Sequence, residues 1–265
     1  MNRIITALDF SDVARACDFV SRIDSSLTRL KVGNQLFTLG GPALIEQWQK
    51  AGFDIFLDLK YHDIPNTVAS ALQAAASLGV WMVNVHASGG PAMLTAARDA
   101  VAQYDRQAKR AGGTRLIAVT VLTSLDRSEM SAAGMDSEPA EQVDRLARLA
   151  FNAGLDGVVC SPHEVGLIRG IVGTDFLTVT PGVRPDKDGE VPVHQITSHG
   201  GAPDDQRRTL TPYDAIVAGS DFLVIGRPIT QAASPVDVLH ALNAEAQIAA
   251  SQLETQRGVG LQPKT

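Results

Sequence analysis

Cysteines are scarce in this chain, and no segment resembles a membrane or export signal. The 265 residues include only Cys17 and Cys160, and neither lies in a CxxC or CxxH pattern. A structural zinc site is therefore not indicated, and so few cysteines are more typical of a reducing compartment than of a disulfide framework. No apolar run approaches the roughly 18 residues that a membrane-spanning helix needs, and MNRIITALDF lacks the apolar core of a signal peptide. We expect a cytoplasmic protein that does not enter a membrane.

Positive charge is also in short supply. The formal net charge is −6, so the chain lacks the basic excess of a broad nucleic-acid surface. A local cationic pocket for an anionic metabolite remains compatible with this balance. The dinucleotide-binding pattern GxGxxG is absent after the first apolar run, which disfavours an open doubly wound sheet.

What the chain does have is a regular alternation of short apolar runs with longer amphipathic stretches. Several of the amphipathic stretches end in glycine, which is typical of a helix C-terminus. Near-continuous apolar strands alternating with helices indicate a parallel sheet whose outer face is covered. The alternation predicts eight strands, at residues 3–9, 28–33, 53–59, 81–87, 114–120, 157–160, 176–180 and 222–226.

Eight strand–helix units in this length predict an α/β protein with a single (β/α)8 TIM-barrel domain at residues 1–250. The segment 185–211 breaks the alternation, because it is rich in Pro, Gly, Asp and His and has no clear period. We expect a long loop there, since unstructured stretches of this length are often functional lids. Residues 251–265 read as a polar C-terminal tail.

Polar residues recur where the predicted strands end. Because the C-terminal strand ends of a barrel carry its chemistry, these residues are expected to share one site rather than to be scattered over helix surfaces. The strand ends hold Asp9, Lys31, Asp58 with Lys60, His86, Thr120 with Thr123, Arg184 and Arg227.

The stretch FLDLKYHDIPNT places three charges at the end of one apolar strand. The two-residue period of a strand puts Asp58 and Lys60 on the same side, where both can project into one pocket beside Lys31. Asp63 follows the strand and precedes Ile64 and a proline. Its spacing is equally compatible with the N-cap of the next helix.

A phosphate site is predicted near the C-terminus, in VIGRPIT. Gly226 permits close approach of the backbone, Arg227 supplies a bidentate donor, and a helix begins there. Barrels often bind phosphate after strands seven and eight, so Arg184 at the base of the long loop is expected nearby.

A set of short motifs occurs in order along the chain. They are ALDF (7–10), KVG (31–33), DLKYHDIPNT (58–67), NVHASGG (84–90), AVTVLTS (118–124), DGVVCS (156–161), TPGVRP (180–185), DDQRRTLTP (204–212) and VIGRPIT (224–230). The most specific of them is DLKxxDIPNT with an upstream KVG. With these motifs the chain resembles the orotidine 5′-phosphate decarboxylase family over nearly its whole length.

The resemblance implies a cofactor-independent carboxy-lyase that converts orotidine 5′-phosphate to UMP in pyrimidine biosynthesis, without a metal and as a homodimer with shared active sites. It implies that Lys60 protonates C6 of the pyrimidine within a network of Lys31, Asp58, Lys60 and Asp63. Asp63 would reach the neighbouring subunit's site. The further substrate-binding residues that it implies are Asp9, Ile64, Thr67, Thr123, Arg184, Gln206, Gly226 and Arg227.

The long loop departs from the family's pattern. The segment GEVPVHQITSHGGA lengthens the connection between Arg184 and Gln206, so the position of Gln206 is less firmly expected than that of Arg227.

The sequence is also compatible with other functions. A magnesium-dependent sugar-phosphate decarboxylase or aldolase on the same barrel shares DxKxxD, but Lys31 stands where such enzymes carry an acid and would repel the metal. A Schiff-base aldolase would need an uncharged Lys60, which flanking carboxylates oppose. A non-catalytic phosphate-ligand binding protein would not need Asp58, Lys60 and Asp63 together.

Overall fold

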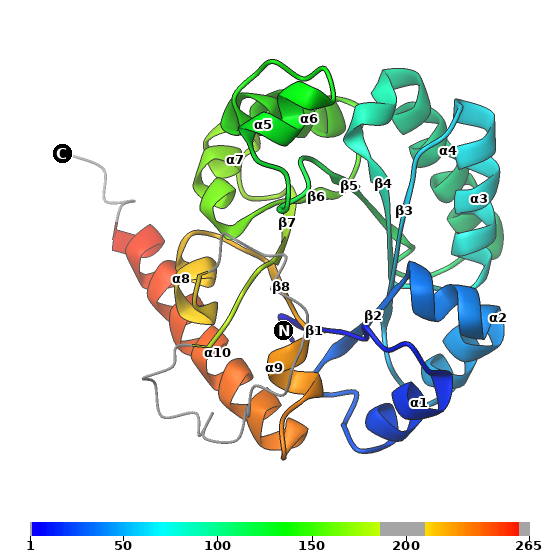
Figure 1. Cartoon of the computed structure of the whole chain (residues 1–265), viewed down its shortest axis with the longest axis vertical. Helices are drawn as coiled ribbons and strands as arrows, with labels where there is room; N and C mark the ends of the chain where they lie inside the picture. Colours follow the sequence, from blue (N-terminus) through cyan, green and yellow to red (C-terminus); the bar gives the residue numbers. More distant parts are fainter. Residues whose placement is uncertain (1, 186–209, 260–265) are drawn as a thin grey trace.

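The computed structural model describes residues 2–185 and 210–259, and its eight parallel strands close into a barrel. The strands follow chain order around the barrel, and β8 pairs with β1 to complete the ring (Figure 1). Each predicted apolar run overlaps one strand, and β3 and β7 extend past the predicted ends, which confirms the predicted TIM barrel. The strands are β1 (Ile4–Ala7), β2 (Arg29–Gly33), β3 (Ile55–Tyr61), β4 (Met82–His86), β5 (Arg115–Val119), β6 (Gly157–Val159), β7 (Leu177–Pro181) and β8 (Phe222–Ile225).

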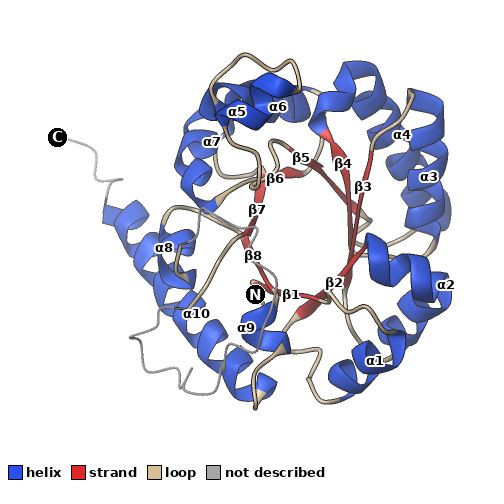
Figure 2. Cartoon of the chain, in the orientation of Figure 1, coloured by secondary structure: helices blue, strands red, loops and turns tan. Residues whose placement is uncertain are grey.

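Helices surround the barrel on its outside (Figure 2). In the described part of the chain, no helix is both long enough and apolar enough to cross a membrane. The α-helices are α1 (Val13–Ser21), α2 (Asn34–Lys50), α3 (Pro65–Ser77), α4 (Gly90–Ala108), α5 (Arg127–Ala132), α6 (Pro139–Asn152), α7 (Val165–Val172), α8 (Pro212–Val217), α9 (Arg227–Thr230) and α10 (Pro235–Val259), with 3-10 turns η1 (Ala87–Gly89) and η2 (Pro162–Glu164).

The predicted long loop and the predicted C-terminal tail both extend beyond the residues that the structure describes. Most of the expected loop 185–211 lies outside them, although Val183 and Leu210 form a parallel bridge where the chain leaves β7 and returns toward α8. The expected tail at 251–265 begins within α10, which continues to Val259.

The outward-facing strand residues pack beneath the helices. Helix α6 illustrates the packing, because its buried residues Val143, Leu146, Ala147 and Ala150 recur at helical spacing along one face. The helix begins with a capping box. The side chain of Glu138 accepts a hydrogen bond from the backbone N–H of Glu141, and the side chain of Glu141 accepts one from the backbone N–H of Glu138. Local sequence and burial therefore specify the same helix.

A smaller apolar cluster comes from the opposite strand faces and fills the barrel interior, with Ile5, Phe56 and Met82 among its members. At the N-terminal end of the barrel, the rings of Trp81 and Phe222 meet edge to face at 5.0 Å. The guanidinium of Arg29 lies 4.3 Å from the centre of the Trp81 ring. Aromatic and cation–π packing thus closes this end of the barrel.

Gly157 in β6 tests the tightness of the strand packing. A Cβ at this position would lie 2.4 Å from the carbonyl oxygen of Leu177 on β7, so Gly157→Ala must displace backbone. We expect a loss of about 1–3 kcal/mol in the free energy of unfolding, measured by urea denaturation.

Gly170→Ala is the matched control, because Gly170 is exposed in α7 and a Cβ there would meet nothing within 4 Å. Alanine favours a helix over glycine by roughly 0.5–1 kcal/mol, so this variant should be as stable as the parent or more so. Equal destabilisation by both substitutions would contradict the assignment of strain to β6.

Candidate active site

A cavity of about 670 Å³ opens among the C-terminal ends of the strands. Its walls combine charged residues with the apolar side chains of Phe56, Val119 and Val159. Eight of the residues expected at the site line it, from β2, β3 and the segments after β1, β5, β7 and β8. They are Asp9, Lys31, Asp58, Lys60, Thr123, Arg184, Gly226 and Arg227.

The carboxylate of Asp58 is the centre of the charged cluster. Its Oδ1 atom lies 2.7 Å from Nζ of Lys60, and its Oδ2 atom lies 3.2 Å from Nζ of Lys31. Only 6% of Asp58 is exposed, so an unpaired charge there would be costly. The two ammonium groups compensate for the burial, one at each oxygen.

Lys31 is shared between two carboxylates. Its Nζ atom also lies 3.3 Å from Oδ1 of Asp9, so the charges alternate from Asp9 through Lys31 and Asp58 to Lys60. Burial alone would lower the pKa of Lys31, but attraction to Asp58 and Asp9 outweighs it, and the net pKa is raised. Lys31 is therefore a fixed cation at neutral pH.

The pKa of Asp58 moves the opposite way. Burial alone would raise it, but the charges of Lys31 and Lys60, with hydrogen bonds from Lys60 and Asn84, lower it below the usual aspartate value. The cluster is therefore ionised on both sides, and it is preorganised before any ligand binds.

A local irregularity of β3 aims Lys60. Between the pairs Leu57–Val83 and Tyr61–Val85 the register of β3 against β4 shifts, and Lys60 adopts a left-handed backbone with φ of 51°. This conformation costs about 1–2 kcal/mol for a residue with a side chain. Strained backbone of this kind is typical of functional sites, and Lys60 still projects to the same side as Asp58.

Asn84 of β4 fills the irregularity, and sequence reasoning did not select it. Its amide oxygen accepts a hydrogen bond from the backbone N–H of Lys60 at 2.8 Å, and its amide nitrogen donates to Oδ1 of Asp58 at 2.7 Å. The residue is fully buried. The signal in the sequence was a single polar residue inside the apolar run WMVNVH.

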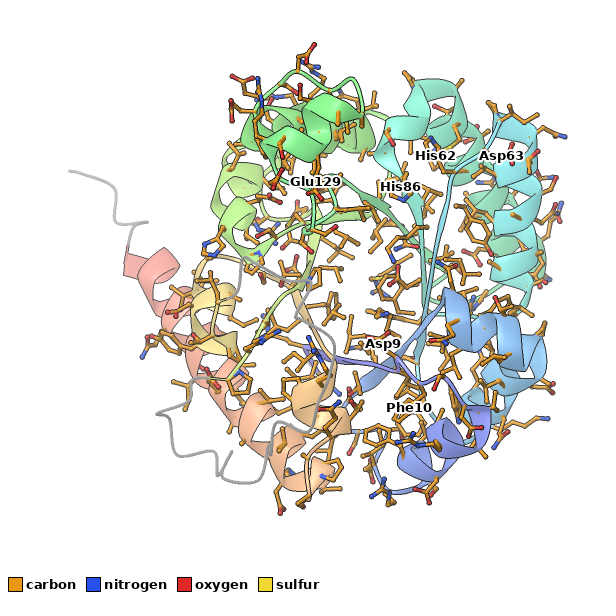
Figure 3. The ribbon with its side chains drawn as sticks, viewed as in Figure 1. Asp9, Phe10, His62, Asp63, His86 and Glu129 are labelled. Carbon is orange, nitrogen blue, oxygen red and sulfur yellow. The ribbon has the colours of Figure 1, made fainter. Side chains whose placement is uncertain are left out.

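Asp63 lies outside the cluster. It is exposed near the beginning of α3, at the outer edge of the barrel, whereas Asp9 lies near the centre (Figure 3). The interpretation of Asp63 as a helix N-cap is wrong, because Ile64 occupies that position without a side-chain cap, and the Asp63 carboxylate accepts from the Ile64 N–H instead. Ile64 and Thr67 are also exposed and do not line the cavity of their own chain.

Two arginines border the cavity, and both lie far from β3 in the sequence. Arg184 follows β7, and Arg227 begins α9 directly after Gly226. Partial burial, followed by the like charge of Arg227, lowers the pKa of Arg184. An anion bound between the two guanidinium groups would relieve this repulsion. Gln206, expected at the same end, lies outside the described residues.

Other strand-end residues have different surroundings. The hydroxyl of Thr120 donates to the carbonyl of Val159, so this residue joins β5 to β6. The rings of His86 and His62 lie 5.6 Å apart, close to one another in Figure 3. Burial lowers the pKa of His86, and electrostatic interactions with His62 and Lys60 add to this effect, which favours a neutral imidazole at pH 7.

Further cavity-lining residues were not anticipated. They include Phe10, Ser11 and Arg15 after β1, and Gln231 after α9. They follow strands whose ends were already predicted to carry the site. Their position in the first residues after those strands is the signal that could have identified them. Among the described residues, no group of three or more His, Cys, Asp or Glu side chains could hold a metal ion.

Comparisons with known proteins define the class to which this barrel belongs. Residues 2–242 match the model of the "Orotidine 5'-phosphate decarboxylase / HUMPS family". The chain therefore belongs to this family.

Individual relatives are close and extend over nearly the whole chain. The orotidine 5'-phosphate decarboxylase of Nitrosospira multiformis is 53% identical over 91% of this chain and 92% of its own length. The protein of the same name from Vibrio campbellii is 52% identical over 91% of this chain and 96% of its own. The crystal structure of orotidine 5'-phosphate decarboxylase from Lactobacillus acidophilus is 36% identical, with a TM-score of 0.78 over 93% of this chain and 99% of that one.

The lowered pKa of Asp58 links the charged cluster to stability. A carboxyl group whose pKa is lower in the folded state stabilises the fold above its unfolded pKa, and that contribution is lost as the pH falls from about 4 toward the folded value. The free energy of unfolding should therefore decline less steeply below about pH 4 in Asp58→Asn than in the parent. Urea denaturation at several pH values measures both slopes. Identical slopes would show that Asp58 does not carry this linkage.

Proposed function

We propose that this protein decarboxylates orotidine 5′-phosphate to UMP and CO2, the last step of UMP biosynthesis, without a cofactor. The observation that carries the proposal is the contact of 2.7 Å between Lys60 and Asp58 in a cavity that Arg184 and Arg227 also line. The cavity volume of about 670 Å³ lies in the range of small-molecule sites. Membership of the family and the names of the close relatives support the same activity.

The two parts of the cavity suit the two parts of this substrate. Arg184 and Arg227 offer planar donors to the dianionic 5′-phosphate, and Gln206 is proposed to join them. Asp9 and Lys31 would contact the ribose, and Thr123 would lie beside the pyrimidine. A methyl group at Gly226 would lie 3.5 Å from Cβ of Ala7 and 3.6 Å from Oδ2 of Asp9, which places Gly226 beside the proposed ribose contact.

The chemical step follows from the position of Lys60. Breaking the bond between C6 and the carboxylate releases CO2 and leaves the electron pair on C6. The Nζ–H of Lys60 gives its proton to C6, which completes UMP, and neutral Lys60 then regains a proton from solvent. Asp58 holds the ammonium in place at 2.7 Å until the transfer.

Proton donation alone is a small part of the required catalysis. A general acid contributes roughly 10²–10⁴-fold in rate, whereas enzymes lower barriers by about 8–23 kcal/mol in total. The larger contribution is electrostatic, since the ammonium of Lys60 already faces the developing anion and needs no reorganisation. Phosphate binding at the arginines supplies energy that fixes the reactive geometry.

A magnesium-dependent sugar-phosphate enzyme of the same barrel is the alternative function. It is less compatible with the cluster, because Nζ of Lys31 lies between the carboxylates of Asp9 and Asp58, at 3.3 and 3.2 Å. A divalent cation at that position would be repelled by the ammonium. A Schiff-base mechanism is likewise disfavoured, since Lys60 is paired with Asp58.

The proposal includes a homodimer with shared sites in the cytoplasm. Asp63, Ile64 and Thr67 are exposed together at the end of β3 and the beginning of α3, and Ile64 is 67% exposed. These three residues belong to the segment DLKYHDIPNT, which carries the resemblance to a family with shared active sites. We propose that these residues complete the neighbouring subunit's site, with Asp63 extending the partner's charged network.

Loss of orotidine 5′-phosphate absorbance, followed with and without EDTA, tests the activity. The parent should be active in both conditions, and Lys60→Ala should abolish turnover while retaining the circular dichroism spectrum of the fold. A Lys60→Ala variant that keeps more than about a tenth of kcat would refute the proton-donor role, since a general acid contributes at least about 10²-fold. Loss of the parent's activity in EDTA would favour the metal-dependent alternative.

Mixing inactive variants tests the shared site. Lys60→Ala and Asp63→Ala subunits should regain activity together, because each mixed dimer has one site with Lys60 from one chain and Asp63 from the other. Lys60→Ala mixed with Asp58→Asn is the control, since both residues belong to the same chain's cluster and no intact site can form. Mixed dimers without activity in the first pair would exclude a role for Asp63 across the interface.

A further inference from the structure

We propose that Asn84 is a positioning residue that holds Lys60 and Asp58 in their reactive arrangement; this inference rests on the proposed function. Asn84 lies on β4, next to the irregular part of β3, and does not line the cavity. It acts through its two neighbours rather than on the substrate.

The two hydrogen bonds of Asn84 fix one another's direction. Its amide oxygen faces the donor N–H of Lys60, and its amide nitrogen faces the acceptor Oδ1 of Asp58. Turning the amide over would put a donor against the N–H and an oxygen against the carboxylate, so only one orientation satisfies both contacts. The side chain is fully buried, and water cannot replace either bond readily.

The bond to Lys60 supports an unusual backbone. The register shift between β3 and β4 takes Lys60 out of the regular ladder, where its φ is 51°. A partly buried N–H left without a partner is costly, so the Asn84 oxygen stabilises this conformation of Lys60. Relaxation of β3 would change the direction in which the Lys60 side chain projects.

The bond to Asp58 fixes the other member of the pair. Oδ1 of Asp58 receives both the Asn84 amide at 2.7 Å and the Lys60 ammonium at 2.7 Å, while Oδ2 contacts Lys31. One side chain thus holds the carboxylate and the backbone of the lysine that pairs with it. A small displacement of a reacting group is enough to cost about 10²-fold in rate.

Asn84→Leu removes both bonds at similar volume and tests the proposal. We expect kcat to fall about 10²-fold while KM stays within about threefold of the parent, because Arg184 and Arg227 are unchanged. The acid limb of kcat should move to higher pH, since Asp58 loses a hydrogen bond that lowers its pKa. The charges that still face Asp58 are Lys31 and Lys60, with His86 nearby.

Thr6→Val is the control for a loss of stability that leaves the positions of Lys60 and Asp58 unchanged. Thr6 is fully buried on β1, and its hydroxyl pairs with that of Thr28 at 2.8 Å, apart from the charged cluster. This variant should lose stability but keep kcat and its acid limb. A kcat for Asn84→Leu within about twofold of the parent, or an equal fall in Thr6→Val, would overturn the proposal, because a displaced reacting group costs far more.

Asn84→Asp provides a second test, which applies even if Asn84→Leu does not fold. The new carboxylate can still accept from Lys60 but opposes Asp58 with like charge, and it can donate to Asp58 only when it binds a proton. The ratio of variant to parent kcat should therefore rise as the pH falls. A low ratio independent of pH, or a ratio near one, would contradict the positioning role.

A parent without decarboxylase activity would refute the proposed function. The acid unfolding of Asn84→Leu then tests the link between Asn84 and Asp58, and an unfolding profile identical to the parent's would overturn that link.

Discussion

The carboxylate of Asp58, buried between two ammonium groups, is the interaction on which the site depends. Each oxygen contacts one lysine, and Asn84 adds a hydrogen bond to the oxygen that faces Lys60. Removal of a single partner would leave an uncompensated charge at a buried position. The mutual dependence of these groups gives a fixed electrostatic field, and a fixed field is what stabilises a developing anion without reorganisation.

The barrel supplies this cluster by geometry. Lys31 and Asp58 belong to neighbouring strands in direct pairing, and Asp9 follows the strand on the other side of β2. Inward-facing positions near the C-terminal ends converge because the sheet closes on itself. The same closure brings residues from β7 and β8 to the cavity, so groups far apart in the sequence surround one ligand-sized space.

Sequence patterns predicted the features that depend on local periodicity. The eight apolar runs gave the strands, and a two-residue period placed Asp58 and Lys60 on one side. The N-cap interpretation of Asp63, one of two that its spacing allowed, is wrong because Pro65 begins α3 and leaves Ile64 at the cap position. The part played by Asn84 was not predictable, because it depends on a register shift between two strands that no single-strand pattern encodes.

The packing at the N-terminal end of the barrel has a consequence for molecular traffic. Trp81 and Phe222, with the guanidinium of Arg29 stacked over the indole, fill that end with ring and side-chain atoms. The cavity among the opposite strand ends is consequently a blind pocket. Whatever enters through its mouth has to leave through the same mouth, so a departing gas molecule and a departing nucleotide would share one exit with the next molecule that arrives.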